Sequence, residues 1–268
     1  MEARGIRVEV ETTTAPRDAA RLSAAAAREG FPEVIVSGGD GTINEALQGL
    51  IGTSVRLAIW PRGTANVLGG ELGLPRRLDR LADVLAAGKV QRAYAGCATI
   101  ESTGEQRYFL LMAGIGIDAA IIDLVRPTLK KRVGVAAFWL SGLESLARWH
   151  PKRFLVEIEG RQYPATFASL GKTPRYGGSL TITPRARLEK PEFEICLIDS
   201  RHRLKYLQLL PFAMFGGIPE GLKNICFVNA AEVRAVGEGV PVQVDGEVIG
   251  TLPMSFRVTS HVVELVTR

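Results

Sequence analysis

The stretch Val34-Ile-Val-Ser-Gly-Gly-Asp-Gly-Thr-Ile-Asn-Glu45 decides how this chain folds. Its first three residues are β-branched and uncharged, and glycines follow soon after, which predicts a short buried parallel strand that ends in a turn. Gly38, Gly39 and Gly41 let the backbone turn sharply and approach a ligand that a Cβ atom would push away. The stretch therefore predicts a strand and a glycine turn built for close contact.

A helix is expected to follow this turn, with Thr42 or Asn44 as its capping residue. A strand, a glycine turn and a helix N-terminus place several free N–H groups around one point, which is typical of a phosphate site. Asp40 lies in the middle, where phosphates would repel it unless a divalent cation lay between them. Asp40 therefore predicts Mg²⁺ carried by a nucleotide. The alternative is that Gly-Asp-Gly is only a turn.

A second stretch, Leu57-Ala-Ile-Trp-Pro-Arg-Gly-Thr-Ala-Asn66, repeats this order of an apolar strand, a turn and a helix start. Gly63 lies in its turn, and Thr64 and Asn66 open the helix. Two such units place small polar side chains at the carboxyl edge of a parallel sheet, where ligands bind in open α/β folds. The two stretches together predict a nucleotide crevice.

Gly38-Gly-Asp-Gly-Thr-x-Asn-Glu45 followed by Pro61-x-Gly-Thr-Ala-Asn66 resembles the diacylglycerol kinase catalytic-domain family, lipid kinases that include the sphingosine and ceramide kinases. The resemblance implies an ATP-dependent lipid kinase that uses Mg²⁺ and transfers the γ-phosphoryl group to a hydroxyl of a diacylglycerol- or sphingoid-like lipid. The first motif alone also resembles NAD kinases, so an NAD-kinase-like enzyme is one alternative. The implied nucleotide-binding residues are Thr13, Gly38, Gly39, Asp40, Gly41, Thr42, Asn44, Glu45, Gly63, Thr64 and Asn66.

The α/β pattern ends near residue 93, where short strands broken by Gly and Pro begin. We expect an α/β domain with a parallel sheet over residues 1–93 and a mainly β, sandwich-like domain over 94–268, whose last strand is a candidate for returning to the first domain. Single strands are predicted over residues 6–11, 108–113, 154–158, 163–170, 180–183, 193–198, 226–236 and 256–266, and helices over 18–29 and 75–88, the latter with Gly88 as its C-cap.

Val244-Asp-Gly-Glu247 on its own predicts a hairpin with Asp245-Gly246 at the turn. By resemblance it is the catalytic stretch, with Glu247 as general base. Asp245 and Glu247 are two residues apart and could share the cleft, and burial or neighbouring carboxylates would raise the pKa of Glu247. Asp118, in Gly114-Ile-Gly-Ile-Asp118, joins the carboxylate network by resemblance; its alternative role is a helix N-cap.

Two departures from the family bear on function. The family opens with a strand and an Asn-Pro-x-Ser-Gly phosphate loop that has no counterpart before Thr13, which leaves a non-catalytic nucleotide- or lipid-binding relative as a second alternative. Where the family has Asp-Gly near a structural Mg²⁺, this chain has Lys190-Pro191. Because a protonated lysine does not ligate Mg²⁺, that second metal site is doubtful.

Composition bears on where the protein is located and on which partners it meets. The chain has 268 residues, a net charge of +5 and three widely spaced cysteines, and its N-terminus lacks the apolar segment of a secretory signal. We expect a reduced, cytoplasmic protein that meets its lipid substrate by peripheral contact with a membrane, with no transmembrane segment and no nucleic-acid partner. The basic stretch 126–132 is either a solvated turn or a contact for lipid headgroups or substrate phosphate. The apolar stretch 206–218 is either a core helix or a lid or membrane-facing element. The oligomeric state stays open, with a homodimer as one candidate.

Overall fold

A computed structural model of the chain describes residues 5, 7–117, 119, 150–177 and 180–268. Its first part alternates helices and strands: α1 (Asp18–Arg28), β1 (Glu33–Gly38), α2 (Asp40–Leu50), β2 (Arg56–Pro61), α3 (Val67–Glu71) and α4 (Leu78–Ala87). Its second part is mainly strands: β3 (Val90–Ile100), β4 (Gln106–Phe109), β5 (Met112–Gly116), β6 (Phe154–Ile158), β7 (Arg161–Ala165), β8 (Phe167–Gly171), β9 (Arg175–Tyr176), β10 (Leu180–Thr181), β11 (Phe193–Ile198), α7 (Arg203–Met214), β12 (Ile225–Ala230), β13 (Glu232–Val236), β14 (Pro241–Val244), β15 (Glu247–Thr251) and β16 (Met254–Val266).

The first part is a parallel α/β unit. β1 and β2 pair in parallel from Glu33↔Arg56 to Gly38↔Pro61, so both strands end at the same edge of the sheet. The expected apolar face of α2 is buried in the core of this unit, with at most 2% of each side chain exposed, and consists of Ile43, Ala46, Leu47 and Leu50. Burying a side chain of this kind stabilises a fold by about 1.5–3 kcal/mol for the larger residues. This face holds α2 against the sheet.

Two helix ends show how the glycines act. Gly88 adopts a left-handed conformation (φ 64°) as the C-cap of α4, as expected. The prediction that Thr42 or Asn44 caps α2 is wrong, because α2 begins at Asp40 with Gly39 as N-cap and no side-chain cap. The chain passes from β1 into α2 across a single residue, so both polar residues lie inside the helix.

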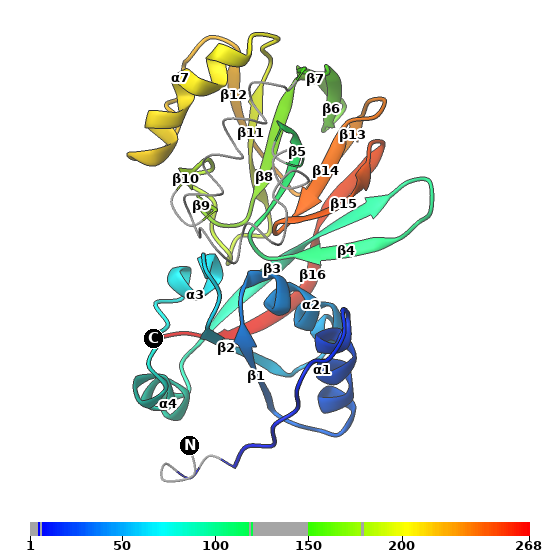
Figure 1. The fold of residues 1–268 in the computed structure, drawn as a ribbon. Coiled ribbons are helices and arrows are strands. Elements are labelled where there is room, and N and C mark those ends of the chain that lie inside the picture. The colour runs from blue at the N-terminus through cyan, green and yellow to red at the C-terminus, as the bar shows by residue number, and fades with distance from the viewer. Residues whose placement is uncertain (1–4, 6, 118, 120–149, 178–179) are drawn as a thin grey trace.

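The second part is a sandwich of two sheets (Figure 1). A six-stranded sheet with the order β12-β11-β8-β5-β14-β15 faces part of an eight-stranded sheet with the order β1-β2-β16-β13-β6-β7, to which β3 and β4 attach through β16. The core between them takes side chains from both sheets, among them Phe154 and Val156 from one, and Ile195 and Val242 from the other. The expected combination of a parallel α/β part with a β sandwich-like part is confirmed.

Two long strands join the parts. β16 pairs with β13 over Glu232–Ala235 and reaches β2 in parallel at Leu265↔Leu57. β3 pairs along most of β16 and crosses residue 93, where we placed the boundary. The two parts therefore share one continuous sheet, on which the site described below is built.

One predicted strand is absent. Within the predicted strand 6–11, the described residues 7–11 are exposed and have no regular secondary structure. Alternating apolar and charged residues fix which side chains would share a face, but they do not supply a neighbouring strand to pair with. Among the described helices, none combines the length and apolarity needed to span a bilayer.

Candidate functional site

The loops after β1 and β2 touch each other through their backbones. The Gly38 carbonyl accepts hydrogen bonds from the N–H groups of Arg62 (2.9 Å) and Gly63 (3.2 Å). A Cβ atom on Gly63 would lie 2.4 Å from the Cα atom of Gly39, which real atoms do not tolerate. Glycine is therefore required here for the loops to pack on each other. Gly41 differs, because a Cβ atom there would meet nothing within 4 Å.

Two side chains fix this junction. Asn66 has a left-handed conformation (φ 47°); its Oδ1 accepts from the Gly63 N–H (2.7 Å) and its Nδ2 donates to the Gly63 carbonyl (2.6 Å). The Asp40 carboxylate accepts from the N–H groups of Val67 (3.1 Å) and Leu68 (3.3 Å) at the start of α3. Asp40 thus links the first loop to the helix that follows the second.

The N-terminus of α2 has the character of an anion site. The first N–H groups of a helix have no intrahelical partner, and α2 is 11 residues long, with Asp40, Gly41 and Thr42 in its first turn. The space at Gly41 is open, and Thr64 is exposed on the neighbouring loop. These features fit a phosphate group better than they fit a bare metal ion.

Arginine side chains that the sequence motifs did not single out flank the second loop. Arg76 donates to the Thr64 carbonyl at 3.5 Å, and the Arg62 guanidinium lies over the Trp60 ring, 4.9 Å from its centroid. Trp60 in turn donates its indole N–H to the Arg76 carbonyl (2.9 Å). Both guanidinium groups are exposed and add positive charge beside Thr64.

A polar stripe on α2 connects this junction to the second part of the molecule. Asp40, Asn44 and Gln48 are spaced by one helical turn, so they lie on one side of α2. Asn44 is buried, and its Nδ2 donates to Asp245 Oδ2 (3.0 Å) and to the Tyr108 carbonyl (3.0 Å). Gln48 bonds both the N–H (3.0 Å) and the carbonyl (2.9 Å) of Tyr108. The stripe therefore runs from the glycine loops to β4 and the β14–β15 hairpin.

Asp245 occupies the turn of that hairpin, as predicted, and its φ of 46° together with 88° at Gly246 is the geometry of a type I′ turn. Its carboxylate accepts four hydrogen bonds, from Asn44 and from three successive backbone N–H groups, those of Leu110, Leu111 and Met112, at 2.9–3.0 Å. Burial raises the pKa of Asp245, and the donated hydrogen bonds oppose that rise. Four donors fill the acceptor positions of a carboxylate, so this group holds the hairpin in place.

Glu247 lies in a different environment. It is the first residue of β15, its side chain is 53% exposed, and it pairs with the Arg107 guanidinium at 3.1 Å. With its side chain about half exposed, Glu247 is only partly buried. Its partner is a cation from β4, which the sequence motifs gave no reason to select.

The side chains of the remaining predicted site residues form no hydrogen bond or ion pair with the glycine loops, the α2 stripe or the β14–β15 hairpin in the described part of the chain. Thr13 is exposed in a segment without regular structure, and Glu45 is half-buried on α2. The neighbouring Thr14 donates its N–H and hydroxyl to Asp18, and these bonds lower the pKa of Asp18 to about 2. Asp118 and the basic stretch 126–132 lie outside the described residues.

No three His, Cys, Asp or Glu side chains come together as a metal-binding set in the described ranges. Asp40 belongs to no such set within those ranges, so it would hold Mg²⁺ together with nucleotide phosphates. Near Lys190-Pro191, the buried Lys172 ammonium donates to the carbonyls of Lys190 and Glu192, the latter at 3.1 Å. A protein cation already binds these carbonyls.

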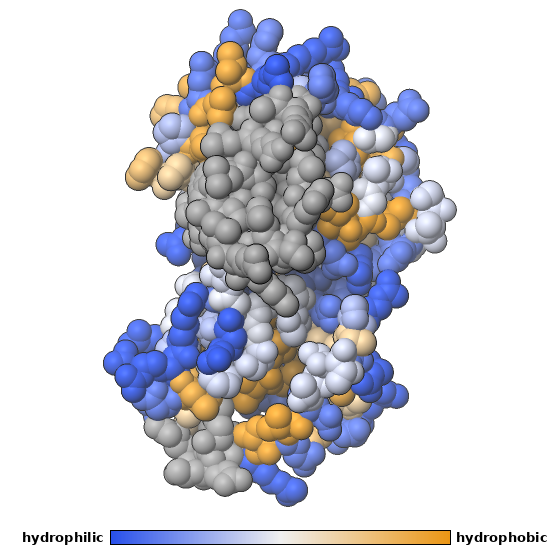
Figure 2. Space-filling view, in the orientation of Figure 1, coloured by the Kyte–Doolittle hydropathy of each residue, from blue (hydrophilic) through white to orange (hydrophobic). Residues whose placement is uncertain are grey.

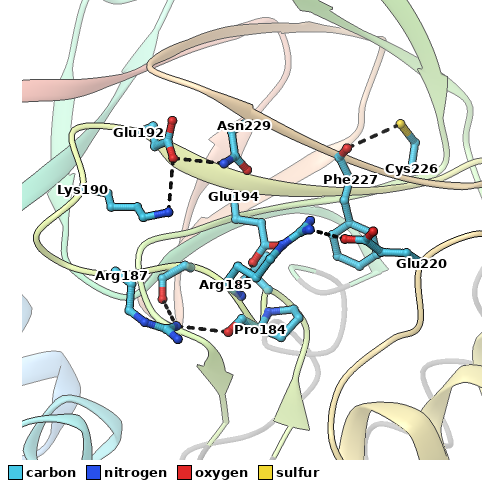
Figure 3. Close-up of polar contacts among 12 residues, drawn as sticks. Pro184, Arg185, Arg187, Lys190, Glu192, Glu194, Glu220, Cys226, Phe227 and Asn229 are labelled. Atoms are coloured by element: carbon cyan, nitrogen blue, oxygen red, sulfur yellow. Dashed lines mark hydrogen bonds and ion pairs between the residues drawn. The ribbon is translucent and has the colours of Figure 1, made fainter.

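The surrounding strands are tied by further charged contacts (Figure 3). Arg185 lies between Glu194 and Glu220 and pairs with both; Glu194 is buried and accepts at 2.8 Å from Arg185 Nε. Glu192 approaches Lys190 (3.7 Å) and accepts from Asn229 (3.0 Å). The network joins the loop before β11 to β12, so we interpret it as structural.

Comparisons with known proteins agree with this arrangement. A family model described as the diacylglycerol kinase catalytic domain matches residues 1–98, and one described as the YegS C-terminal NAD kinase beta sandwich-like domain matches residues 112–267. A diacylglycerol kinase from Mycobacterium tuberculosis is 31% identical over 240 residues, which cover 88% of this chain and 77% of that protein.

Solved structures show the same fold. A diacylglycerol kinase from Bacillus anthracis has a TM-score of 0.71 at 20% identity, over 96% of this chain and 83% of that chain. An NAD kinase from Archaeoglobus fulgidus in complex with ATP has a TM-score of 0.50 at 13% identity, over 89% of this chain and 79% of that chain. With two family models that together span most of its length and a relative at 31% identity, this chain belongs to the diacylglycerol kinase catalytic-domain family.

Proposed function

We propose that this chain is an ATP-dependent lipid kinase that transfers the γ-phosphoryl group of ATP to a hydroxyl of a diacylglycerol- or sphingoid-like lipid at a membrane surface. One observation supports this above the others. The polar stripe of α2 starts at a helix N-terminus suited to phosphate and ends on the hairpin that carries Glu247. The proposed phosphate site and the hairpin of the candidate proton acceptor would thus be positioned by one helix.

The residues divide into binding and positioning roles. The first-turn N–H groups of α2, with Thr64, would bind the phosphates, and Asp40 would hold Mg²⁺ together with them. The ion would neutralise charge on the transferred group. Asn44 and Asp245 would fix the hairpin, and Arg107 would hold Glu247, which would take the proton from the lipid hydroxyl as the new P–O bond forms and the bond to the β-phosphate oxygen breaks.

The test is phosphoryl transfer to dispersed lipids, with wild-type protein compared with Glu247→Gln. We expect the variant to keep its unfolding temperature, because Glu247 is exposed, and to lose about 100-fold or more of the rate, as loss of a general base does. Glu238→Gln is the matched control, an exposed glutamate just before β14. Full activity in Glu247→Gln would remove the general-base assignment.

The exposure of Glu247 and its pairing with a cation favour one second candidate, a non-catalytic relative that binds nucleotide or lipid. That protein would bind MgATP without transferring phosphate to any acceptor. An acceptor panel that includes NAD separates both candidates from an NAD-kinase-like enzyme.

A further inference from the structure

Helix α7 exposes apolar side chains where a surface helix ordinarily carries polar ones. Leu209 and Ala213 are buried against the six-stranded sheet. The opposite side carries what we call the apolar face of α7: Leu204 (66% exposed), Leu207 (38%), Phe212 (46%), Met214 (43%) and, directly after the helix, Phe215 (84%). Both sides of the helix are therefore apolar.

These residues form one surface. At about 100° per residue, Leu204, Leu207, Met214 and Phe215 fall within roughly a third of the helix circumference, and Phe212 lies about 60° beyond Phe215. Figure 2 shows hydrophobic surface over the region where α7 lies, with hydrophilic surface at its upper end. Gly216 and Gly217, both with positive φ, turn the chain away directly after Phe215 and leave its ring projecting.

The charges around this surface favour one occupant. Residues 200–223 contain four Lys/Arg and one Asp/Glu. Arg201 and Arg203 are exposed, and Lys205 is partly exposed on the first turn. The acidic residue Glu220 already pairs with Arg185. A cationic border beside exposed Leu, Met and Phe side chains complements anionic headgroups above an acyl layer.

We propose that the apolar face of α7 docks onto an anionic lipid bilayer, with Phe212 and Phe215 entering the acyl boundary and Arg201, Arg203 and Lys205 contacting headgroups. The proposal rests on the proposed function in one respect, since a lipid kinase must reach a substrate held in a membrane. The occupant is the bilayer itself, so binding requires neither ATP nor turnover.

The test is sedimentation with phosphatidylcholine vesicles, with and without phosphatidylglycerol, in the absence of ATP. We expect wild type to bind the anionic vesicles more tightly and to dissociate as salt rises. Phe212→Ser/Phe215→Ser should weaken binding by about tenfold or more, because two exposed apolar side chains no longer partition. Leu155→Ser, an exposed leucine on β6, is the matched control and should bind like wild type.

A second readout reports insertion directly. Phe215→Trp should give a blue-shifted emission on adding anionic vesicles, quenched by lipids that carry a quencher in the acyl chain. Equal binding by wild type and Phe212→Ser/Phe215→Ser, or no spectral shift in Phe215→Trp, would overturn the proposal. So would sedimentation equilibrium showing a dimer that the double serine variant dissociates. Kinase activity on detergent-dispersed lipid is measured separately, so a failed membrane contact leaves the proposed function standing.

Discussion

The glycines of the two loops fall into two types that differ in their tolerance of a side chain. Gly39 and Gly63 touch each other, so a side chain at either one meets backbone. Gly41 meets nothing in the protein, although it lies in the first turn of a helix, where alanine is favoured. Packing therefore gives no reason for glycine at position 41, whereas the proposed phosphate would.

Gly41→Ala should stabilise the fold by about 0.5–1 kcal/mol through helix propensity and should weaken MgATP binding, because the new methyl group would enter the space left for phosphate. Thermal unfolding and calorimetric titration measure the two effects. Gly70→Ala is the control, because a Cβ atom there also meets nothing but the residue lies on α3 and not on α2. Equal MgATP affinity in both variants would contradict a phosphate at α2.

Asp245→Asn should cost about 2–4 kcal/mol of unfolding free energy, because the amide NH₂ group would face N–H donors that now point at a carboxylate oxygen. Urea unfolding measures this loss. The exposed Asp79→Asn should change the urea midpoint little. Glu247→Gln should lower the transfer rate without lowering the stability. If Asp245→Asn behaved in the same way, stable but inactive, Asp245 would have to be assigned a catalytic role rather than a positioning one.

The sequence predicted the residues of the loop junction better than their contacts. Gly38, Gly63 and Asn66 are close in the chain to the strands that position them, so local pattern was enough. The partners of Asn44, Asp245 and Glu247 lie 64 to 201 residues away in the chain, and the largest separation is that of the Asn44–Asp245 pair. No local pattern encodes contacts at such separations. Arg107 was missed for this reason.

At the scale of elements, three predicted strands each proved to be two. Residues 108–113, 163–170 and 226–236 form the corners β4–β5, β7–β8 and β12–β13, at which the chain passes from one sheet to the other. The first corner is fixed by Asp245, which takes the N–H groups of residues 110–112 out of the ladder. The second is fixed by Thr166, whose hydroxyl bonds Ile198 and Ser200 carbonyls. Continuous apolar runs hide such corners, because both sides of a corner are buried.

The loop between β10 and β11 depends on the buried Lys172, whose pKa burial lowers from its ordinary value of 10.5 to about 8, against the attraction of Glu192 and Glu189. Between these two values the unfolded chain binds more protons than the folded one, so the contribution of Lys172 to stability rises as pH rises from about 8 to 10.5. Lys172→Met removes this dependence and leaves two carbonyls unpaired.

The difference in unfolding free energy between wild type and Lys172→Met should therefore grow by about 2–3 kcal/mol across that range. Urea midpoints measured below pH 8 and at about pH 10 test it. Lys152→Met, which removes an exposed ammonium that bonds the Gly239 carbonyl, should show no such growth. A constant difference for Lys172→Met would mean that the ammonium titrates at its ordinary pKa.

At the scale of the whole molecule, shared strands join two large cores, and the core around α2 and β2 also takes in Leu110, Leu111 and Leu188 from beyond residue 93. One core lies around α2 and β2, and another lies between the two sheets. β16 contributes Leu265 to the first and Phe256 to the second within one strand. β16 pairs with strands of both parts, across a register shift between Val258 and Val262, so we expect the two cores to unfold together.

Leu265→Ala and Leu170→Ala test this coupling from opposite ends. Both leucines are fully buried, Leu265 in the first core and Leu170 in the second, so each variant should lose about 2–5 kcal/mol. If the shared strands make one cooperative unit, hydrogen exchange under rising urea should show α2 and β11 losing protection at one common urea midpoint. In each variant this midpoint should fall in proportion to the unfolding free energy that the variant has lost. Separate midpoints, with Leu265→Ala shifting only α2, would show that β16 bends between two units that fold independently, and the α2 stripe would then be a contact between separate units rather than part of one rigid frame.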